Sequence, residues 1–281
     1  MIIWLASYPK SGNTYIRSFL SAYYFSLNGE FEFEQLKNID QYPDQKFFDQ
    51  KITTKKHASE NWLSSQEKLK KSGKNFIFKT HSALVKINKN FFTTPENTLG
   101  IIYIIRDPRN IITSIKKHYT MDYDQALFMM LNKNEFLYDK LNKGDYSKFT
   151  FLGSWSNHYK SWISAKKYNR IIIKFEDLEN NKIDVLKNLI LFINKITGKN
   201  ENKIDKKRFM KAIETTNFGH LKKKENKEGF PEAILSKKTK ENVNFFNLGF
   251  ENKWETILPK EIKMRLNGEL KDDIKFWKYK L

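Results

Sequence analysis

Short runs of apolar residues alternate along this chain with longer segments in which apolar residues recur at helical spacing. The runs cover residues 2–6, 75–79, 99–105 and 170–175, and each is typical of a buried strand. The segments after them predict helices over residues 14–25, 110–117, 123–142, 155–167 and 183–197. Strands that alternate with helices in this way predict an α/β fold, in which a central parallel sheet is flanked by helices on both faces.

The pattern dissolves over residues 216–253, and it returns as a helical pattern over residues 260–277. A connection of this length inside a compact domain is usually a functional lid or a disordered linker. We expect a lid over residues 219–253, because its aromatic side chains favour packing; they are Phe230, Phe245, Phe246 and Phe250. No repeat and no boundary divides the chain, so we expect one domain over residues 1–281.

The composition excludes some classes of site and partner. The chain has no cysteine, which excludes disulfides, thiolate zinc sites and a cysteine nucleophile. Its formal net charge is +19, but lysine is abundant everywhere, so we attribute much of the charge to composition bias and expect no nucleic-acid partner. The opening run MIIWLAS lacks a preceding basic region, and no stretch approaches the roughly 18 apolar residues that cross a bilayer. We therefore expect a cytoplasmic protein that does not insert into membranes.

The loop between the first predicted strand and helix, residues 8–14, carries groups that suit an anion. Lys10 supplies a mobile charge, Gly12 lets the backbone approach a ligand, and the start of a helix favours negative charge. Further donors stand at Ser11, Asn13 and Thr14. An ordinary capped turn is the alternative interpretation. The loop is not a Walker A motif, because that motif places its lysine directly after its second glycine, and here the single glycine follows the lysine.

The second predicted strand ends at Lys79, Thr80 and His81. A histidine at the carboxyl end of a parallel strand, beside a lysine, is well placed to take a proton from a nucleophile near neutral pH. We therefore predict His81 as a general base. We expect the other histidines to be surface or packing residues; they are His57, His118, His158 and His220.

The third predicted strand ends at Arg106, and Ser114 lies two turns into the helix that follows. An arginine side chain suits a phosphate, because its guanidinium donates two parallel hydrogen bonds. An ion pair of Arg106 with Asp107 or Asp177 is the alternative.

Together, these three clusters resemble the soluble branch of the sulfotransferase family that depends on 3′-phosphoadenosine 5′-phosphosulfate (PAPS). YPKSGNTY resembles the family's 5′-phosphosulfate loop, YPKSGTTW, from which Asn13 and Tyr15 depart mildly. KTH resembles the strand end that supplies the family's catalytic histidine and an assisting lysine. RDPRNIITS resembles its 3′-phosphate element, with arginine and serine eight positions apart. The order and spacing of the clusters match as well.

Weaker similarities extend over nearly the whole chain. Phe175 falls where an aromatic residue flanks the adenine in the family, and Thr216 and Phe218 fall at family adenine contacts. Gly249 and Trp254 match the end of the family's R-K-G-x-x-G-x-W signature. The chain departs from that signature where arginine and lysine are replaced by Asn247 and Leu248, so half of the 3′-phosphate clamp is missing. We expect compensation from Lys237 and Lys238, with Arg109 as a further candidate.

The resemblance implies a single P-loop-like domain and an in-line transfer of sulfonate from PAPS, which leaves 3′-phosphoadenosine 5′-phosphate (PAP). His81 would take the acceptor's proton, Lys79 and Lys10 would stabilise charge, and Ser114 would position Lys10. Cofactor contacts are expected from Lys10, Ser11, Gly12, Asn13, Thr14, Tyr15, Arg106, Ser114, Phe175, Thr216, Phe218 and Gly249. No metal is expected.

The resemblance implies an acceptor group that is a hydroxyl or an amine, on a small molecule or a glycan, and we expect residues 40–73 and 120–151 to form its pocket. The oligomeric state stays open. Two other functions stay open as well: a P-loop-like kinase that uses ATP, and a non-catalytic protein that binds polyanions.

Overall fold

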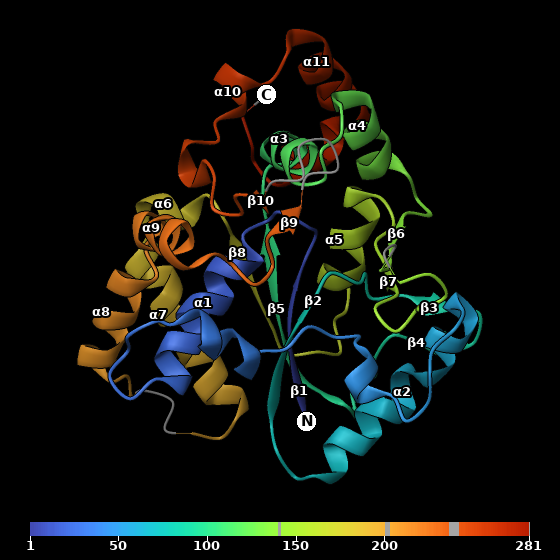
Figure 1. Cartoon of the computed structure of the whole chain (residues 1–281), viewed down its shortest axis with the longest axis vertical. Helices are drawn as coiled ribbons and strands as arrows, with labels where there is room; N and C mark the ends of the chain where they lie inside the picture. The colour runs from blue at the N-terminus through green and yellow to red at the C-terminus, as the bar shows by residue number, and fades with distance from the viewer. Residues whose placement is uncertain (140–141, 200–202, 236–241, 281) are drawn as a thin grey trace.

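The computed structural model describes residues 1–139, 142–199, 203–235 and 242–280 (Figure 1). Its main sheet has four parallel strands in the order β2-β1-β5-β8. Their bounds are β1 Ile2–Ser7, β2 Phe76–Thr80, β5 Thr98–Ile105 and β8 Arg170–Lys174. All four predicted strands are confirmed, and their ends differ from the expected ends by at most one residue.

Strand β1 lies inside the sheet, because it pairs with β2 on one side and with β5 on the other. All of its residues are buried. Successive side chains of a strand point to opposite faces, and accordingly Ile3 and Leu5 belong to one hydrophobic cluster while Trp4 and Ala6 belong to another. The sheet therefore separates two cores.

Helices cover both faces, as predicted. On the left of the sheet in Figure 1 lie α1 (Asn13–Phe25), α7 (Lys182–Ile196) and α8 (Lys206–Thr215), which pack into the cluster around Ile3. On the right lie α2 (Lys55–Lys71) and α5 (Trp155–Ile163), which pack into the cluster around Trp4. The α/β fold with a central parallel sheet is confirmed.

Shorter elements complete the chain. The remaining α-helices are α3 (Pro108–His118), α4 (Tyr123–Leu131), α6 (Asp177–Asn180), α9 (Phe218–Glu228), α10 (Trp254–Ile257), α11 (Lys260–Glu269) and α12 (Lys271–Phe276). Short 3₁₀ helices are η1 (Phe33–Asn38), η2 (Gln45–Phe47) and η3 (Gly249–Glu251). Three antiparallel pairs join β3 (Lys86–Ile87) to β4 (Asn90–Phe91), β6 (Phe136–Leu137) to β7 (Thr150–Phe151), and β9 (Ile234–Leu235) to β10 (Asn242–Val243).

The helix predicted over residues 123–142 was wrong in its length. Helix α4 ends at Leu131, and Asn132 then forms a turn in which its side chain accepts a hydrogen bond from the backbone N–H of Asn134. Asparagine competes in this way with the helical backbone, so it often ends a helix. The chain continues into β6, and residues 140 and 141 lie outside the described residues.

Two segments that were predicted from the sequence as loops contain helices. Residues 40–73, an expected acceptor loop, include the 17 residues of α2. The expected lid over residues 219–253 includes most of α9 together with β9, β10 and η3, and we call its described residues, 219–235 and 242–253, the lid segment below. The helical pattern over residues 260–277 is two helices, α11 and α12, which meet at Leu270.

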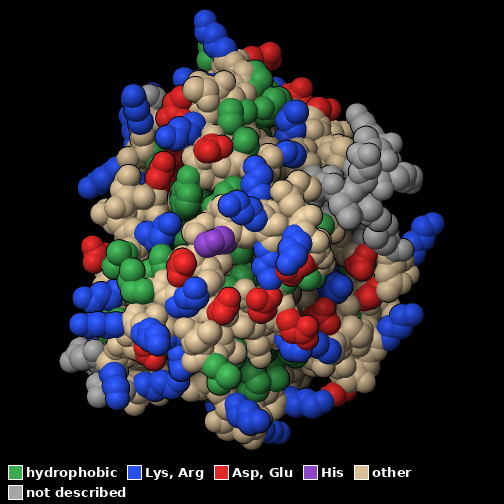
Figure 2. Space-filling model, turned by 60° about the vertical axis from the view of Figure 1, so that its left-hand side comes forward, with side chains coloured by type: hydrophobic (Ala, Val, Ile, Leu, Met, Phe, Trp, Pro, Cys, Tyr) green, Lys and Arg blue, Asp and Glu red, His purple; other side chains and the backbone are tan. Residues whose placement is uncertain are grey.

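The carboxyl ends of the main strands point to the upper part of Figure 1, toward α3 and the β9–β10 pair. On the face that Figure 2 presents, lysine and arginine side chains are interspersed with aspartate and glutamate and do not form one continuous patch. Within the described residues, no helix is both long and apolar enough to span a bilayer.

Candidate active site

The loop after β1 brings the start of α1 to the carboxyl edge of the sheet. Gly12 stands immediately before α1 with a φ of 97°, a left-handed conformation that glycine adopts without strain. A Cβ atom at this position would lie 2.2 Å from the ring of Phe175. Glycine is therefore required here both by the backbone and by the aromatic side chain packed against it.

Several polar groups in this loop have no partner among the described residues. The hydroxyl of Ser11 and the side-chain oxygen of Asn13 are buried without a hydrogen bond, although the Asn13 amide donates to the Leu5 carbonyl at 3.0 Å. Helix α1 also has no side-chain cap and no acidic residue in its first turn. Because the first N–H groups of a helix lack partners within it, this loop fits an anion such as a phosphate.

Lys10 extends from the same loop into a cationic region. Its Nζ lies 4.0 Å from the centre of the Phe245 ring, which belongs to the lid segment. Burial, and then the charges of Lys79 and Arg106, lower the pKa of Lys10 to about 7. Since nearby negative charge favours a protonated amine, a bound anion would raise this pKa again.

His81 follows the end of β2 and is oriented by the end of β1. Its Nδ1 lies 2.8 Å from the carbonyl oxygen of Ser7. A carbonyl only accepts hydrogen bonds, so Nδ1 carries the proton and Nε2 keeps its lone pair. Burial, and then the charge of Lys79, lower the pKa of His81 to about 3, which keeps the imidazole neutral at physiological pH. The arrangement leaves Nε2 able to accept a proton.

His158 supports the backbone of His81, since its Nε2 donates to the His81 carbonyl at 3.0 Å and its Nδ1 accepts from the Tyr103 hydroxyl at 2.9 Å. The expected packing role of His158 fits its complete burial. His118 packs against the rings of Tyr119 and Phe245, as expected, and it also lines the same cavity as His81. His118 lies one turn of α3 after Ser114, and this spacing on one helix face is the sequence signal that could have indicated its position.

Lys79 is held by a carboxylate that the sequence did not reveal. Its Nζ lies 2.9 Å from Oε2 of Glu232 in the lid segment, and Arg17 of α1 pairs with the other oxygen, Oε1. Lys79 and Glu232 are 153 positions apart. No sequence motif points to Glu232. The only sequence signal for Arg17 is that a charged residue stands beside the apolar positions of α1.

Arg106 joins the loop after β1 to the lid segment. Its two terminal nitrogens donate to the carbonyls of Lys10, at 3.2 Å, and Gly249, at 3.0 Å, and its guanidinium lies 4.3 Å from the centre of the Phe175 ring. Its Nε is buried and has no partner among the described residues. The alternative of an ion pair with Asp107 does not hold, because both oxygens of Asp107 bind Arg109.

The hydroxyl of Ser114 donates to the Asn110 carbonyl at 3.2 Å and accepts from the Asn252 amide at 3.0 Å. Among the described residues it makes no hydrogen bond to Lys10, so the structure gives no support to the expectation that it positions that lysine. Ser114 nevertheless lines the cavity, two turns from Arg106.

The aromatic residues differ in their access to the site. Phe175 stacks on Phe250 with ring centres 4.9 Å apart, and Phe218 lies against Gly249. Tyr15 also lines the cavity. Thr216 is different, because it is fully buried and its hydroxyl donates to the Ala212 carbonyl. The structure gives no support to its expected place among the adenine contacts, since its hydroxyl is used by the last turn of α8.

These groups surround one cavity of about 350 Å³. Most of the cofactor contacts expected from the sequence line it, and the lid segment closes one side. Among the described lining residues the positive side chains are Lys10, Lys79, Arg106 and Lys117, and the one acidic side chain is Glu232. The cavity lining also includes Gln41, His118, Tyr119 and Leu137.

The structure does not support the residues that were expected to replace the missing arginine and lysine. Arg109 is fully buried, with Asp107 and the Lys280 carbonyl as partners, so it has no free face for a phosphate. Lys237 and Lys238 lie outside the described residues. In the described parts of the chain, no group of three or more histidine, aspartate and glutamate side chains is placed to hold a metal ion.

Comparison with known proteins gives a consistent result. The family model for the sulfotransferase domain matches residues 2–275. The chain is 25% identical over 271 residues to sulfotransferase 1B1 of Canis lupus familiaris, which covers 92% of this chain and 83% of that protein. It is 23% identical to sulfotransferase 1E1 of Rattus norvegicus, with coverage of 93% and 79%.

Two solved structures share the fold at lower identity. Mouse sulfotransferase SULT7A1 complexed with PAP has a TM-score of 0.57 and 19% identity, and the match covers 97% of this chain and 84% of that chain. Retinol dehydratase in complex with androsterone and the inactive cofactor PAP has a TM-score of 0.58 and 17% identity, with coverage of 98% and 80%.

Proposed function

The chain belongs to the sulfotransferase family, and we propose that it moves a sulfonate from PAPS to a hydroxyl or amine with His81 as the general base. The observation that carries this proposal is the hydrogen bond from His81 Nδ1 to the Ser7 carbonyl, 2.8 Å long. It leaves an unprotonated Nε2 in the same cavity as Lys10 and Lys79. The base and the cations therefore share one enclosed space.

The donor fits the residues that are present. We propose that the loop around Gly12 and the start of α1 hold its 5′ end, because buried polar atoms there lack partners. PAPS supplies the sulfonate and a phosphate leaving group. PAP is bound by the solved relative SULT7A1, which supports the same nucleotide here. In this arrangement the aromatic side chains of Tyr15 and Phe218 are available to the adenine.

The chemistry of the protein's own residues follows from their positions. His81 Nε2 takes the proton of the acceptor group while the acceptor's oxygen or nitrogen forms a bond to sulfur. The bond from sulfur to the phosphate oxygen breaks, and that oxygen keeps the electron pair. Lys10 and Lys79 stabilise the negative charge that grows on the phosphate oxygen and the sulfonate. His81 then releases the proton to solvent.

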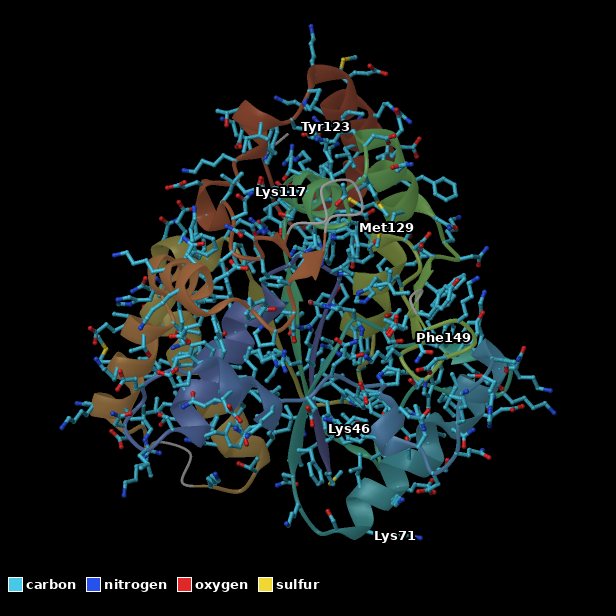
Figure 3. All side chains as sticks on the ribbon, in the orientation of Figure 1. Lys46, Lys71, Lys117, Tyr123, Met129 and Phe149 are labelled. Carbon is cyan, nitrogen blue, oxygen red and sulfur yellow. The ribbon has the colours of Figure 1, made fainter. Side chains whose placement is uncertain are left out.

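We propose that Lys117 and Lys222 take the place of the missing arginine and lysine in the 3′-phosphate clamp. Lys117 lines the cavity one turn after Ser114, at the upper edge of the sheet in Figure 3. Lys222 of α9 donates to the Asn247 carbonyl at 3.1 Å, so it reaches the position where the family has arginine. Burial, and then the charge of Lys222, lower the pKa of Lys117, which indicates that the two amines lie close together.

The acceptor is proposed to be a small molecule that enters beside His81. Retinol dehydratase, a structural relative, binds androsterone and retinol, which supports an acceptor of that size. The whole chain, residues 1–281, is proposed to act as one domain whose lid segment closes over the donor.

The experiment measures transfer of labelled sulfonate from PAPS to a panel of phenols, alcohols and amines, together with thermal stabilisation by PAP. The proposal expects labelled product, and stabilisation by PAP without metal. Stabilisation only by ATP with magnesium would favour the kinase instead. Stabilisation by any polyanion, without labelled product, would favour a binding protein.

A further inference from the structure

One carboxylate in the cavity has no part in the chemistry above. Glu232 comes from the lid segment, and its two oxygens are divided between Lys79, at 2.9 Å, and Arg17. The side chains of Lys79 and Arg17 are only 7% and 6% exposed, and that of Glu232 is 28% exposed. Charges at such depth interact much more strongly than charges in water, so this arrangement is not an incidental surface pair.

Arg17 is fixed independently of Glu232. Its Nε donates to the Ile39 carbonyl at 2.7 Å, and its second terminal nitrogen donates to the Leu36 carbonyl at 2.8 Å. Only its remaining nitrogen faces Glu232. The guanidinium is therefore an anchor that sets the position of the carboxylate from the side of α1.

Lys79 gains both position and charge from this carboxylate. Its ammonium has three N–H donors, of which Glu232 uses one, and the backbone of Lys79 is committed to Asp40 and Tyr42. Two donors are left for the cavity that also contains His81. A lysine that must act on a transferred group needs both a fixed position and a retained proton.

The electrostatic surroundings make the proton hard to retain. The titratable and charged groups around Lys79 come from five places. They are Arg17 on α1, Lys10 in the loop after β1, His81 after β2, His118 on α3, and Glu232 in the lid segment. Burial lowers the pKa of Lys79, Glu232 opposes that change, and Arg17 adds to it. Although burial alone would raise the pKa of Glu232, Lys79 and then Arg17 lower it to about 2, so the carboxylate stays ionised.

We propose that Glu232 is a positioning residue for Lys79, a carboxylate that the lid segment supplies so that the lysine keeps its place and its charge beside His81. This inference rests on the proposed function, since it concerns a lysine to which that function assigns charge stabilisation. It also ties catalysis to the lid segment, because a lid segment displaced from the sheet would remove the carboxylate from Lys79.

The test compares Glu232→Gln with Glu225→Gln. Glu225 is also a buried glutamate of the lid segment, but its oxygens accept hydrogen bonds from the backbone of Phe245 and Phe246, at 2.6 and 2.8 Å. Glu225→Gln therefore disturbs the lid segment without removing the charge at Lys79. The first readout is the titration of Lys79 in the substrate-free protein. It is monitored by NMR of reductively ¹³C-methylated lysines, and the Lys79 signal is assigned by its absence in Lys79→Arg.

The expected result is specific to Glu232. Glu232→Gln lowers the proton affinity of Lys79 by about tenfold or more, because an opposite charge at this distance shifts a pKa by about 1 to 3. Glu225→Gln leaves the titration of Lys79 unchanged. In transfer assays, the alkaline limb of the kcat/KM profile moves to lower pH in Glu232→Gln alone. Glu232→Asp, with a shorter side chain, produces a smaller change in the same direction. It replaces Glu232→Gln as the test variant if Glu232→Gln does not fold.

Two outcomes would overturn the inference. An unchanged titration of Lys79 in Glu232→Gln or Glu232→Asp would show that the carboxylate does not stabilise the protonated form of Lys79. Tighter PAPS binding and faster transfer in Glu232→Gln at every pH would show that Glu232 competes with the donor for Lys79. Absence of transfer in the wild type would instead contradict the proposed function, while the titration of the substrate-free protein would still test the role of Glu232.

Discussion

The carboxyl edge of the main sheet and the lid segment build opposite sides of one cavity in different ways. At the sheet edge, backbone pairing places the functional groups, as His81 follows β2 directly and binds the last residue of β1. The lid segment has only short elements, and it reaches the sheet edge through Glu232 and through the Gly249 carbonyl, which accepts from Arg106. The residues to which we assign chemistry stand at or just after the carboxyl ends of paired strands, while those proposed to close and adjust the site stand on the lid segment.

If this division is right, the largest effect of any single change comes from His81 at the sheet edge. His81→Ala should lower the transfer rate by about 10²- to 10⁴-fold, the usual cost of losing a general base, while PAP affinity stays nearly the same. His220→Ala, at an exposed histidine on α9, is the control. Steady-state kinetics and calorimetry on the same preparations measure both quantities. Retention of more than about a tenth of the activity would remove His81 from this role.

Lys10 sharpens the comparison because it belongs to the sheet edge and touches Phe245 of the lid segment. Lys10→Ala should weaken PAP binding and slow transfer together. A charge-assisted bond to phosphate contributes about 1.5 to 3 kcal/mol, so PAP affinity should fall by about 10- to 100-fold. Lys223→Ala, at an exposed lysine of α9, is a matched control. A variant unchanged in both measurements would mean that Lys10 is only a solvated charge.

Residues of both regions contribute to the proposed 3′-phosphate clamp. Arg106→Ala should remove most of the preference for PAP over adenosine 5′-phosphate. The double variant Lys117→Ala/Lys222→Ala should lower the preference for PAP by about tenfold, because exposed lysines form weaker contacts than a buried arginine. The same comparison in Lys237→Ala/Lys238→Ala tests the substitutes expected from the sequence. A full preference in the Lys117/Lys222 double variant would show that neither amine contributes.

An effect on stability, rather than on binding or rate, separates the two regions by pH. Burial is the first cause that lowers the pKa of three histidines near the sheet edge, with His81 and His118 at about 3 and His158 at about 4. Their unfolded value is 6.5, so the unfolded chain binds more protons and stability falls as pH drops below about 6.5. Glu232, whose ordinary value is 4.5, contributes stability that is lost only below about 4.5.

Urea unfolding at pH 7.5 and 5.5 measures this difference. At pH 5.5 each neutral imidazole should cost about 1 kcal/mol of unfolding free energy. His118→Gln should reduce the pH dependence, and His220→Ala should leave it as in the wild type. Equal stability at the two pH values would contradict the neutral, buried state of the three imidazoles.

Sequence patterns predicted the sheet edge well, because its functional residues stand directly after apolar runs. Lys79 is the second-last residue of β2, and His81 and Arg106 directly follow β2 and β5, whose bounds were predicted to within one residue. The roles given to these residues remain predictions, as does the extent of the domain. The family and the fold, in contrast, are confirmed.

The contacts of the lid segment could not be predicted in this way, because they join distant positions without a shared motif. Arg17 and Glu232 are 215 positions apart, and nothing in their local sequence links them. The side chain of Thr216 is used by its own helix, and that of Arg109 by Asp107. Whether a polar side chain faces a cavity or a neighbouring backbone depends on tertiary packing, which a single motif does not contain.

The central claim is that this cavity binds the nucleotide of PAPS, and its most direct test is the affinity of the wild type for PAP and for adenosine 5′-phosphate. Calorimetry without metal at low salt measures both, and needs no knowledge of the acceptor. The account predicts that PAP binds at least about 10-fold more tightly, since Arg106, Ser114 and two lysines would contact the extra phosphate. Equal affinities would show that the cavity does not recognise the 3′-phosphate, and would contradict PAPS as the donor.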